Sequence, residues 1–79
     1  MNEIKVCEDC LIKQKVKSLH FDGTEQSIKL LQQLYKNSND KINMNTLHTK
    51  INQWVVKYPD GKIIWRKDCC FDINYKVLK

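Results

Sequence analysis

The segment from Gln53 to Leu78, QWVVKYPDGKIIWRKDCCFDINYKVL, restricts the fold more than any other part of this chain. Two short apolar stretches flank Pro59-Asp60-Gly61, a sequence typical of a hairpin turn. Proline fixes a negative φ at the first turn position, and glycine accepts the positive φ that closes a hairpin with a bulge. A third stretch alternates between apolar and polar residues; its apolar members are Phe71, Ile73, Tyr75 and Val77. The segment therefore predicts three antiparallel strands, the last from Phe71 to Leu78, with residues 66–70 as a connection.

The first third of the chain predicts a strand followed by a helix. Residues 1–10 are polar, and we expect them to be irregular. Residues 11–21 alternate well enough for a strand whose one face carries Ile12, Val16 and His20. Apolar side chains at helical spacing follow, and they predict an amphipathic helix from Glu25 to Tyr35 or Lys36. They are Ile28, Leu31, Leu34 and Tyr35.

The start of this helix has two candidate N-caps. Asp22 followed three residues later by Glu25 resembles a capping box, and Thr24 is the alternative. After the helix, residues 37–40 (NSND) predict a loop, and residues 41–46 predict a short second strand.

Together these elements predict one small α+β domain over residues 1–79. Its single amphipathic helix packs on a four- to five-stranded antiparallel sheet in the order β-α-β-β-β-β. A chain of 79 residues buries only about 60–65% of its unfolded surface, which suits one helix on one sheet. The alternative architecture is a winged helix, with residues 46–57 as a second helix and the hairpin as the wing.

The charge is basic, with a formal net value of +5 that comes from 13 lysines and one arginine, Arg66. A positive surface favours acidic partners, either nucleic acid or an acidic protein. Phosphate-binding surfaces usually recruit Arg for its bidentate geometry, so the excess of lysine over arginine favours a solubilising surface. Uninterrupted apolar runs are far shorter than the roughly 18 residues that span a bilayer, and no apolar leader precedes residue 10. We expect a protein of the cytoplasm.

Four cysteines are the only residues with the pattern of a metal site. Cys7 and Cys10 have CxxC spacing, and Cys69 and Cys70 are adjacent. Two such pairs can form an all-thiolate zinc site, but adjacent residues of an extended strand point to opposite faces. Four reduced thiols in a cytosolic protein are the other interpretation.

Catalytic patterns are missing from the sequence. His20 and His48 have no partner nearby in sequence that would make a triad or a ligand set. Gly23 and Gly61 are the two glycines, too few for a phosphate-binding loop. The sequence therefore predicts that the protein is not an enzyme.

The order of elements and the closing motif resemble a group of small proteins of tailed phages and prophages. The residues that carry this resemblance are residues 18–23 (SLHFDG), residues 42–47 (INMNTL), Trp54, Lys57, Gly61, Ile63, Lys67, Phe71 and Tyr75. The similarity covers roughly residues 11–78. Asn52-Gln53 replaces a Gly-Asp pair before the tryptophan, Trp65 is slightly displaced, and the cysteines lie outside the pattern. The resemblance implies a phage or prophage origin and brings no catalytic residues.

The predicted outer face of the sheet is the candidate binding surface. It comprises Lys15, Lys17, Lys57, Arg66 and Lys76, with Val55 and Ile64 among the charges. Lysines mixed with aliphatic residues suit an acidic groove on another protein. The function predicted first is a phage accessory protein that binds and inhibits or redirects a host protein. Such a partner is a nuclease or polymerase complex, in counter-defence (anti-CRISPR activity) or host takeover. The alternative is a small nucleic-acid-binding protein that uses the same lysines.

Overall fold

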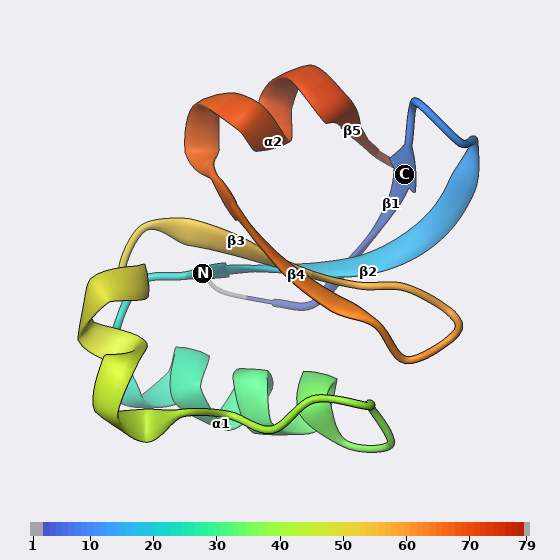
Figure 1. Cartoon of the computed structure of the whole chain (residues 1–79). Coiled ribbons are helices and arrows are strands. Elements are labelled where there is room, and N and C mark those ends of the chain that lie inside the picture. The colour runs from blue at the N-terminus through green and yellow to red at the C-terminus, as the bar shows by residue number, and fades with distance from the viewer. Residues whose placement is uncertain (1–2, 79) are drawn as a thin grey trace.

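The structure, a computed structural model, describes residues 3–78 and shows one antiparallel sheet with a helix on each face (Figure 1). The elements in chain order are β1 (Lys5–Asp9), β2 (Gln14–Phe21), α1 (Glu25–Tyr35), the 3-10 helix η1 (Met44–Lys50), β3 (Gln53–Lys57), β4 (Ile63–Lys67), α2 (Asp68–Asn74) and β5 (Tyr75–Val77). The strand order is β4-β3-β2-β1-β5. The predicted α+β class with an antiparallel sheet is confirmed, whereas the β-α-β-β-β-β order with one helix is wrong.

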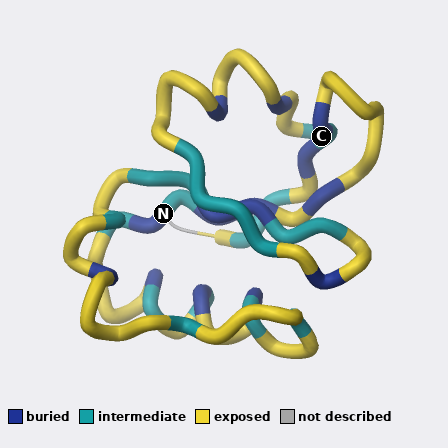
Figure 2. Tube along the Cα trace, viewed as in Figure 1, coloured by how far each residue is buried: buried dark blue, intermediate teal, exposed yellow. Residues whose placement is uncertain are grey.

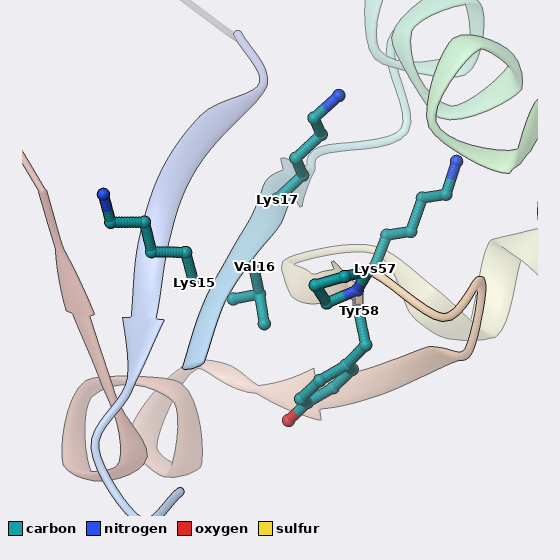
Figure 3. A pocket seen from close by; sticks show the side chains of 6 residues that line it. Lys15, Val16, Lys17, Lys57 and Tyr58 are labelled. Carbon is teal, nitrogen blue, oxygen red and sulfur yellow. The ribbon is translucent and has the colours of Figure 1, made fainter. Parts of the chain in front are cut away.

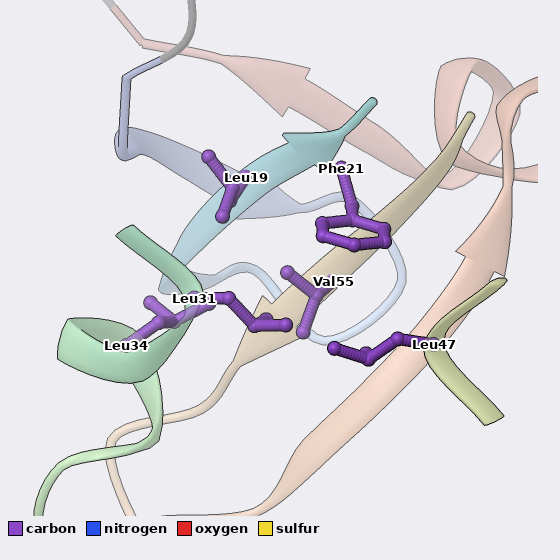
Figure 4. Packing of buried hydrophobic residues seen from close by; sticks show 6 residues of the cluster. All are labelled: Leu19, Phe21, Leu31, Leu34, Leu47 and Val55. Atoms are coloured by element: carbon purple, nitrogen blue, oxygen red, sulfur yellow. The ribbon is translucent and has the colours of Figure 1, made fainter. Parts of the chain in front are cut away.

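The centre of the sheet is buried on both faces. Val55 and Val56 are neighbours on β3, and each is 0% exposed. Because successive side chains of a strand point to opposite faces, both can be buried only when both faces are covered. Val55 belongs to the cluster under α1, which Figure 4 shows; its buried members are Leu19, Phe21, Leu31, Leu34, Leu47 and Val55. Val56 belongs to the cluster under α2; its buried members are Cys7, Val16, Val56, Phe71 and Tyr75.

Helix α1 has the predicted bounds and its apolar stripe faces the sheet. Leu31 and Leu34 are buried, and Figure 2 shows the buried positions of α1 on the side toward the sheet. Thr24 is the N-cap, and its hydroxyl accepts a hydrogen bond from the Ser27 amide at 3.2 Å. The capping-box prediction for Asp22 is wrong: its carboxylate accepts from the Thr24 amide, and Asp22 lies two residues before the N-cap.

The expectation that residues 1–10 are irregular is wrong for residues 5–9, which form β1 in the interior of the sheet, between β2 and β5; residues 1–2 lie outside the described residues. The first strand predicted over residues 11–21 splits accordingly. A tight turn at residues 10–13 contains Lys13 at φ 54°, and its amide donates to the Asp9 carbonyl at 2.7 Å. Ile12 lies in this turn and is exposed, so it does not share a face with Val16 as predicted.

The predicted strand over residues 41–46 is also wrong. Residues 44–50 form η1, which begins where the Asn43 side chain accepts a hydrogen bond from the Asn45 amide. Leu47 of η1 completes the cluster under α1. The winged-helix alternative fails as well, because residues 53–57 are a strand paired with β2 and β4.

The largest correction is α2, since residues 71–78 were predicted to be one strand. Residues 68–74 form a helix instead, and Phe71 is buried on its inner side. The Phe71 ring stacks on Trp54, with centroids 4.0 Å apart and planes 5° apart, and on Tyr75 at 5.0 Å. A helical turn brings Phe71 and Tyr75, four residues apart, to the same side, whereas a straight strand would leave this sheet face uncovered. Tertiary packing thus overrides the alternating pattern.

Replacement of Phe71 by Ala is expected to destabilise the protein by about 3–5 kcal/mol, because it empties the space between Trp54 and Tyr75. Ile73→Ala is the matched control: Ile73 is 78% exposed on the outer side of α2, and its loss is expected to change stability by less than about 0.5 kcal/mol. Urea unfolding measures both. Equal losses would contradict the helix and support a strand that buries both side chains.

Candidate functional site

Helix α1 covers only part of its face of the sheet, and the uncovered part carries lysines. Strand register defines this surface, because directly paired residues lie on one face. Lys17 of β2 pairs with Val6 of β1 and with Lys57 of β3. One row further along, Glu8 pairs with both Lys15 and Lys76. We call this surface the lysine face; it comprises Val6, Glu8, Lys15, Lys17, Lys57 and Lys76.

Three of these lysines project from the same side of the sheet (Figure 3). Together with Val16, Tyr58 and Pro59, these three lysines line a hollow of about 260 Å³. The side chains of Val16 and Tyr58 point away from the lysine ammonium groups (Figure 3). Lys57 is fixed in place, since its ammonium donates to the Lys36 carbonyl at 2.7 Å. Lys36 is the C-cap of α1, whose last turn has no basic residue, so Lys57 supplies the positive charge that the helix C-terminus favours.

The lysine face is mixed in character, not uniformly positive. Glu8 lies between Lys15 and Lys76, and such opposite-charge pairs stabilise adjacent strands. Val6, beside Lys17 in the other row, is 47% exposed although it is a large aliphatic residue. The surface therefore offers both positive charge and an apolar contact.

The structure brings together four of the seven predicted surface residues. Lys15, Lys17, Lys57 and Lys76 share the lysine face, but the other three do not belong to it. Val55 is fully buried beneath α1. Arg66 and Ile64 lie on the opposite face, because they pair with Trp54 and Val56.

The errors for Arg66 and Ile64 have one cause, the register of the hairpin between β3 and β4. Val55 does lie on the same face as Lys57, but α1 covers it. Tyr58 and Lys62 form the last pair, linked by the Tyr58 amide to the Lys62 carbonyl at 2.8 Å, and Gly61 has the predicted positive φ of 94°. A loop of three residues pairs Val55 with Trp65 and Trp54 with Arg66. In this register Arg66 and Ile64 lie on the same face as Trp54 and Val56, opposite to the lysines.

A buried polar chain lies behind the lysine face, and the sequence did not reveal it. The Tyr58 hydroxyl donates to the Asp9 carboxylate at 2.6 Å, so the Tyr75 hydroxyl, 2.7 Å away, must donate to Tyr58. The other Asp9 oxygen accepts from the Leu11 amide. Burial raises the pKa of Tyr58 far above its ordinary value, and the hydrogen bonds to Asp9 and Tyr75 raise it further. These hydrogen bonds link side chains from the ends of β1, β3 and β5.

Arg66 lies close to this polar chain. Its Nε atom is buried without a hydrogen-bond partner, and hydrogen bonding to Tyr75 is the main influence that raises the Arg66 pKa. Arg66 pairs with Trp54 on the α2 face of the sheet, on the side away from the lysine face.

The four cysteines do not converge. Cys7 is buried on the α2 face, where its sulfur lies 2.9 Å from the Ser18 hydroxyl, and burial raises its pKa. Cys10, Cys69 and Cys70 are exposed. Within residues 3–78, no three His, Cys, Asp or Glu side chains gather in an arrangement that could hold a metal ion. The CxxC pair is thus divided between the core and the surface.

The two histidines lie apart from each other and from the lysine face. The His20 ring meets Trp54 edge-on at 5.1 Å and forms part of the α2 face. His48 borders a second hollow, of about 180 Å³, whose other walls include Ile28 and Ile51. In the described part of the chain, no helix has the length and apolar character needed to cross a membrane.

Comparison with known proteins gives no family for this chain: it matches no family model, and no curated protein or solved structure is significantly similar to it. The resemblance to small phage proteins therefore stays a prediction.

The raised pKa values predict that stability falls at alkaline pH. The pKa of Tyr58 exceeds its ordinary value of 10.0 in the folded state, so the unfolded chain loses this proton first as the pH rises. The free energy of unfolding should then decline above pH 10, by up to about 1.4 kcal/mol per pH unit for this group. Burial also raises the pKa of Cys7 above its ordinary value of 9.0 and that of Tyr35 above 10.0, so both groups lower the stability at alkaline pH in the same way.

Tyr58→Phe separates the contribution of Tyr58 from the others. Urea unfolding of both proteins between pH 8 and pH 11 should give a shallower alkaline decline for the variant. Parallel curves would show that the Tyr58 hydroxyl has no raised pKa in the folded protein.

Proposed function

We propose that the protein binds stoichiometrically to an acidic surface of another protein through the lysine face. The observation that carries this proposal is the uncovered sheet surface on which Lys15, Lys17, Lys57 and Lys76 meet. Opposite charge steers and orients such a partner, and the exposed Val6 beside Lys17 supplies an apolar contact. The bound group that the lysines favour is a carboxylate of an acidic side chain.

Two features favour a protein partner over nucleic acid. Glu8 lies among the lysines, where it would repel a phosphate backbone. The aromatic rings that could stack on bases are engaged elsewhere, since Trp54, Phe71 and Tyr75 stack on one another under α2.

The biological setting that we propose is a phage or prophage acting on its host. The resemblance of the hairpin and the closing segment to small phage proteins supports this setting. Inhibition of a host nuclease, as in anti-CRISPR counter-defence, and redirection of a polymerase complex both require binding without catalysis. We propose a non-enzymatic protein of the host cytoplasm on the same grounds.

Charge reversal on the lysine face tests this function. A tagged chain is passed through bacterial lysates, and we expect a stoichiometric partner whose capture is lost in the Lys15→Glu, Lys17→Glu variant. Lys29→Glu, Lys41→Glu is the matched control, because both positions are exposed and lie outside the lysine face. Each double variant lowers the net charge from +5 to +1, four units for two reversals. Equal capture by all three proteins would exclude the lysine face as the binding surface.

Nucleic acid is the second candidate, because the same four lysines can contact phosphates. Titration against duplex DNA at increasing salt distinguishes the two. Four phosphate contacts would give a slope of log K against log salt of about −3.6, at about −0.9 per contact. We expect no binding at low salt. A steep slope that is lost on reversal of Lys15 and Lys17 would favour nucleic acid over an acidic protein.

A further inference from the structure

The first turn of α2 presents two thiols side by side. Cys69 and Cys70 are both exposed, and their sulfur atoms are 3.8 Å apart. Adjacent residues on a strand would point to opposite faces, but on a helix they lie only about 100° apart, so both can face solvent. The helical structure of residues 68–74 therefore places both thiols of the vicinal pair where one cation can reach them.

The separation of the two sulfurs matches tetrahedral coordination. Zinc–thiolate bonds of about 2.3 Å at the tetrahedral angle place two sulfurs about 3.8 Å apart. We propose that Cys69 and Cys70 form half of a tetrahedral thiolate site for a zinc-like divalent cation. The same pair from a second copy of the chain supplies the other half. This inference is independent of the function proposed for the lysine face.

The turn that carries the thiols is held rigidly. Phe71, the next residue, is stacked between Trp54 and Tyr75. Asp68, the residue before, accepts a hydrogen bond from the Trp54 indole nitrogen at 2.8 Å. Both neighbours of the pair are thus fixed to the sheet, which keeps the thiols on the outer side of α2.

One chain cannot complete the site from the described residues. Within residues 3–78, no third His, Cys, Asp or Glu side chain is placed to join the pair around a metal ion. A structural zinc site is closed at four ligands, so two chains with two thiolates each satisfy it. The first CxxC cysteine, Cys7, is buried beside Ser18 and cannot contribute.

The surface beside the thiols suits contact with a second copy. Ile73 lies one turn after Cys69 on the same side of α2, and it is 78% exposed. Leu11 is 86% exposed in the turn that follows β1, and this turn is joined to α2 by the Cys10 amide and the Asn74 carbonyl at 2.9 Å. Two exposed aliphatic side chains near the thiols are the kind of surface that a metal-bridged dimer would cover.

The coordination step involves no oxidation. Each thiol releases its proton to the solvent as its sulfur binds the cation, so four protons leave when two chains close about one ion. Binding should therefore weaken at low pH. A reductant that does not chelate metals keeps Cys69 and Cys70 from forming a disulfide.

Cobalt(II) is the probe, since tetrahedral thiolate coordination gives it intense visible bands and a sulfur-to-metal charge-transfer band. Anaerobic titration of the reduced chain is expected to saturate at about one cobalt ion per two chains. Sedimentation velocity should show a dimer with the metal and a monomer with chelator. Zinc should displace cobalt and remove the cobalt absorption bands without dissociating the dimer.

Single serine variants identify which cysteines bind the metal ion. Cys69→Ser and Cys70→Ser are each expected to abolish the charge-transfer band and the dimer, with an unchanged circular dichroism spectrum that shows intact folding. Cys10→Ser is the matched control, because Cys10 is exposed in the same region and is expected to bind cobalt like the parent. Saturation at one ion per monomeric chain, or equal loss in Cys10→Ser, would overturn the proposal.

Discussion

The insertion of Phe71 between Trp54 and Tyr75 is the contact on which the two-sided architecture depends. Without it, the sheet face that carries Cys7, Val16 and Val56 would be open to water, and only the face under α1 would be covered. The stack also fixes where the chain enters β5, so Tyr75 reaches Tyr58 and completes the polar chain to Asp9. A seven-residue helix is too short to be stable alone, so packing and not helix propensity holds α2 in place.

The parts of the sheet that the two helices cover determine where the exposed charge lies. Helix α1 packs over β2 at Leu19 and Phe21, and it leaves uncovered the part of the same face where Lys15 and Lys17 project. Burial of these lysines would require paired acidic groups, and Glu8 is the one acidic residue among them. The open surface is therefore a consequence of one short helix on a five-stranded sheet, and its charge keeps it hydrated when no partner is bound.

The parts of the fold that sequence patterns predicted are the ones governed by local interactions. The bounds of α1 follow from its apolar period, and the hairpin turn follows from the glycine at position 61, which adopts the positive φ that the turn requires.

The errors arose where contacts between residues distant in sequence determine the local structure. Strand β1 contains Asp9, a residue type depleted in strands. Contacts from distant residues stabilise it: Ser18 contacts Cys7, and Tyr58 donates to Asp9. The alternation of Phe71, Ile73, Tyr75 and Val77 fits a strand, yet the stack with Trp54 selects a helical turn. For the lysine face, one shift in hairpin pairing moved Arg66 and Ile64 to the other side, while the lysines of β2 kept their place.

The two proposed surfaces lie on opposite sides of the sheet, and this placement has a physical consequence. The lysine face is on the α1 side, whereas Cys69 and Cys70 are on the outer side of α2. A dimer joined through α2 would therefore leave both lysine faces uncovered. Two such faces on one assembly can engage two acidic sites of a multisubunit partner at once, and the second contact then forms at a high effective concentration. Four weak charge contacts per chain, each worth little in water, would in this way add up to stable binding without a larger interface on either chain.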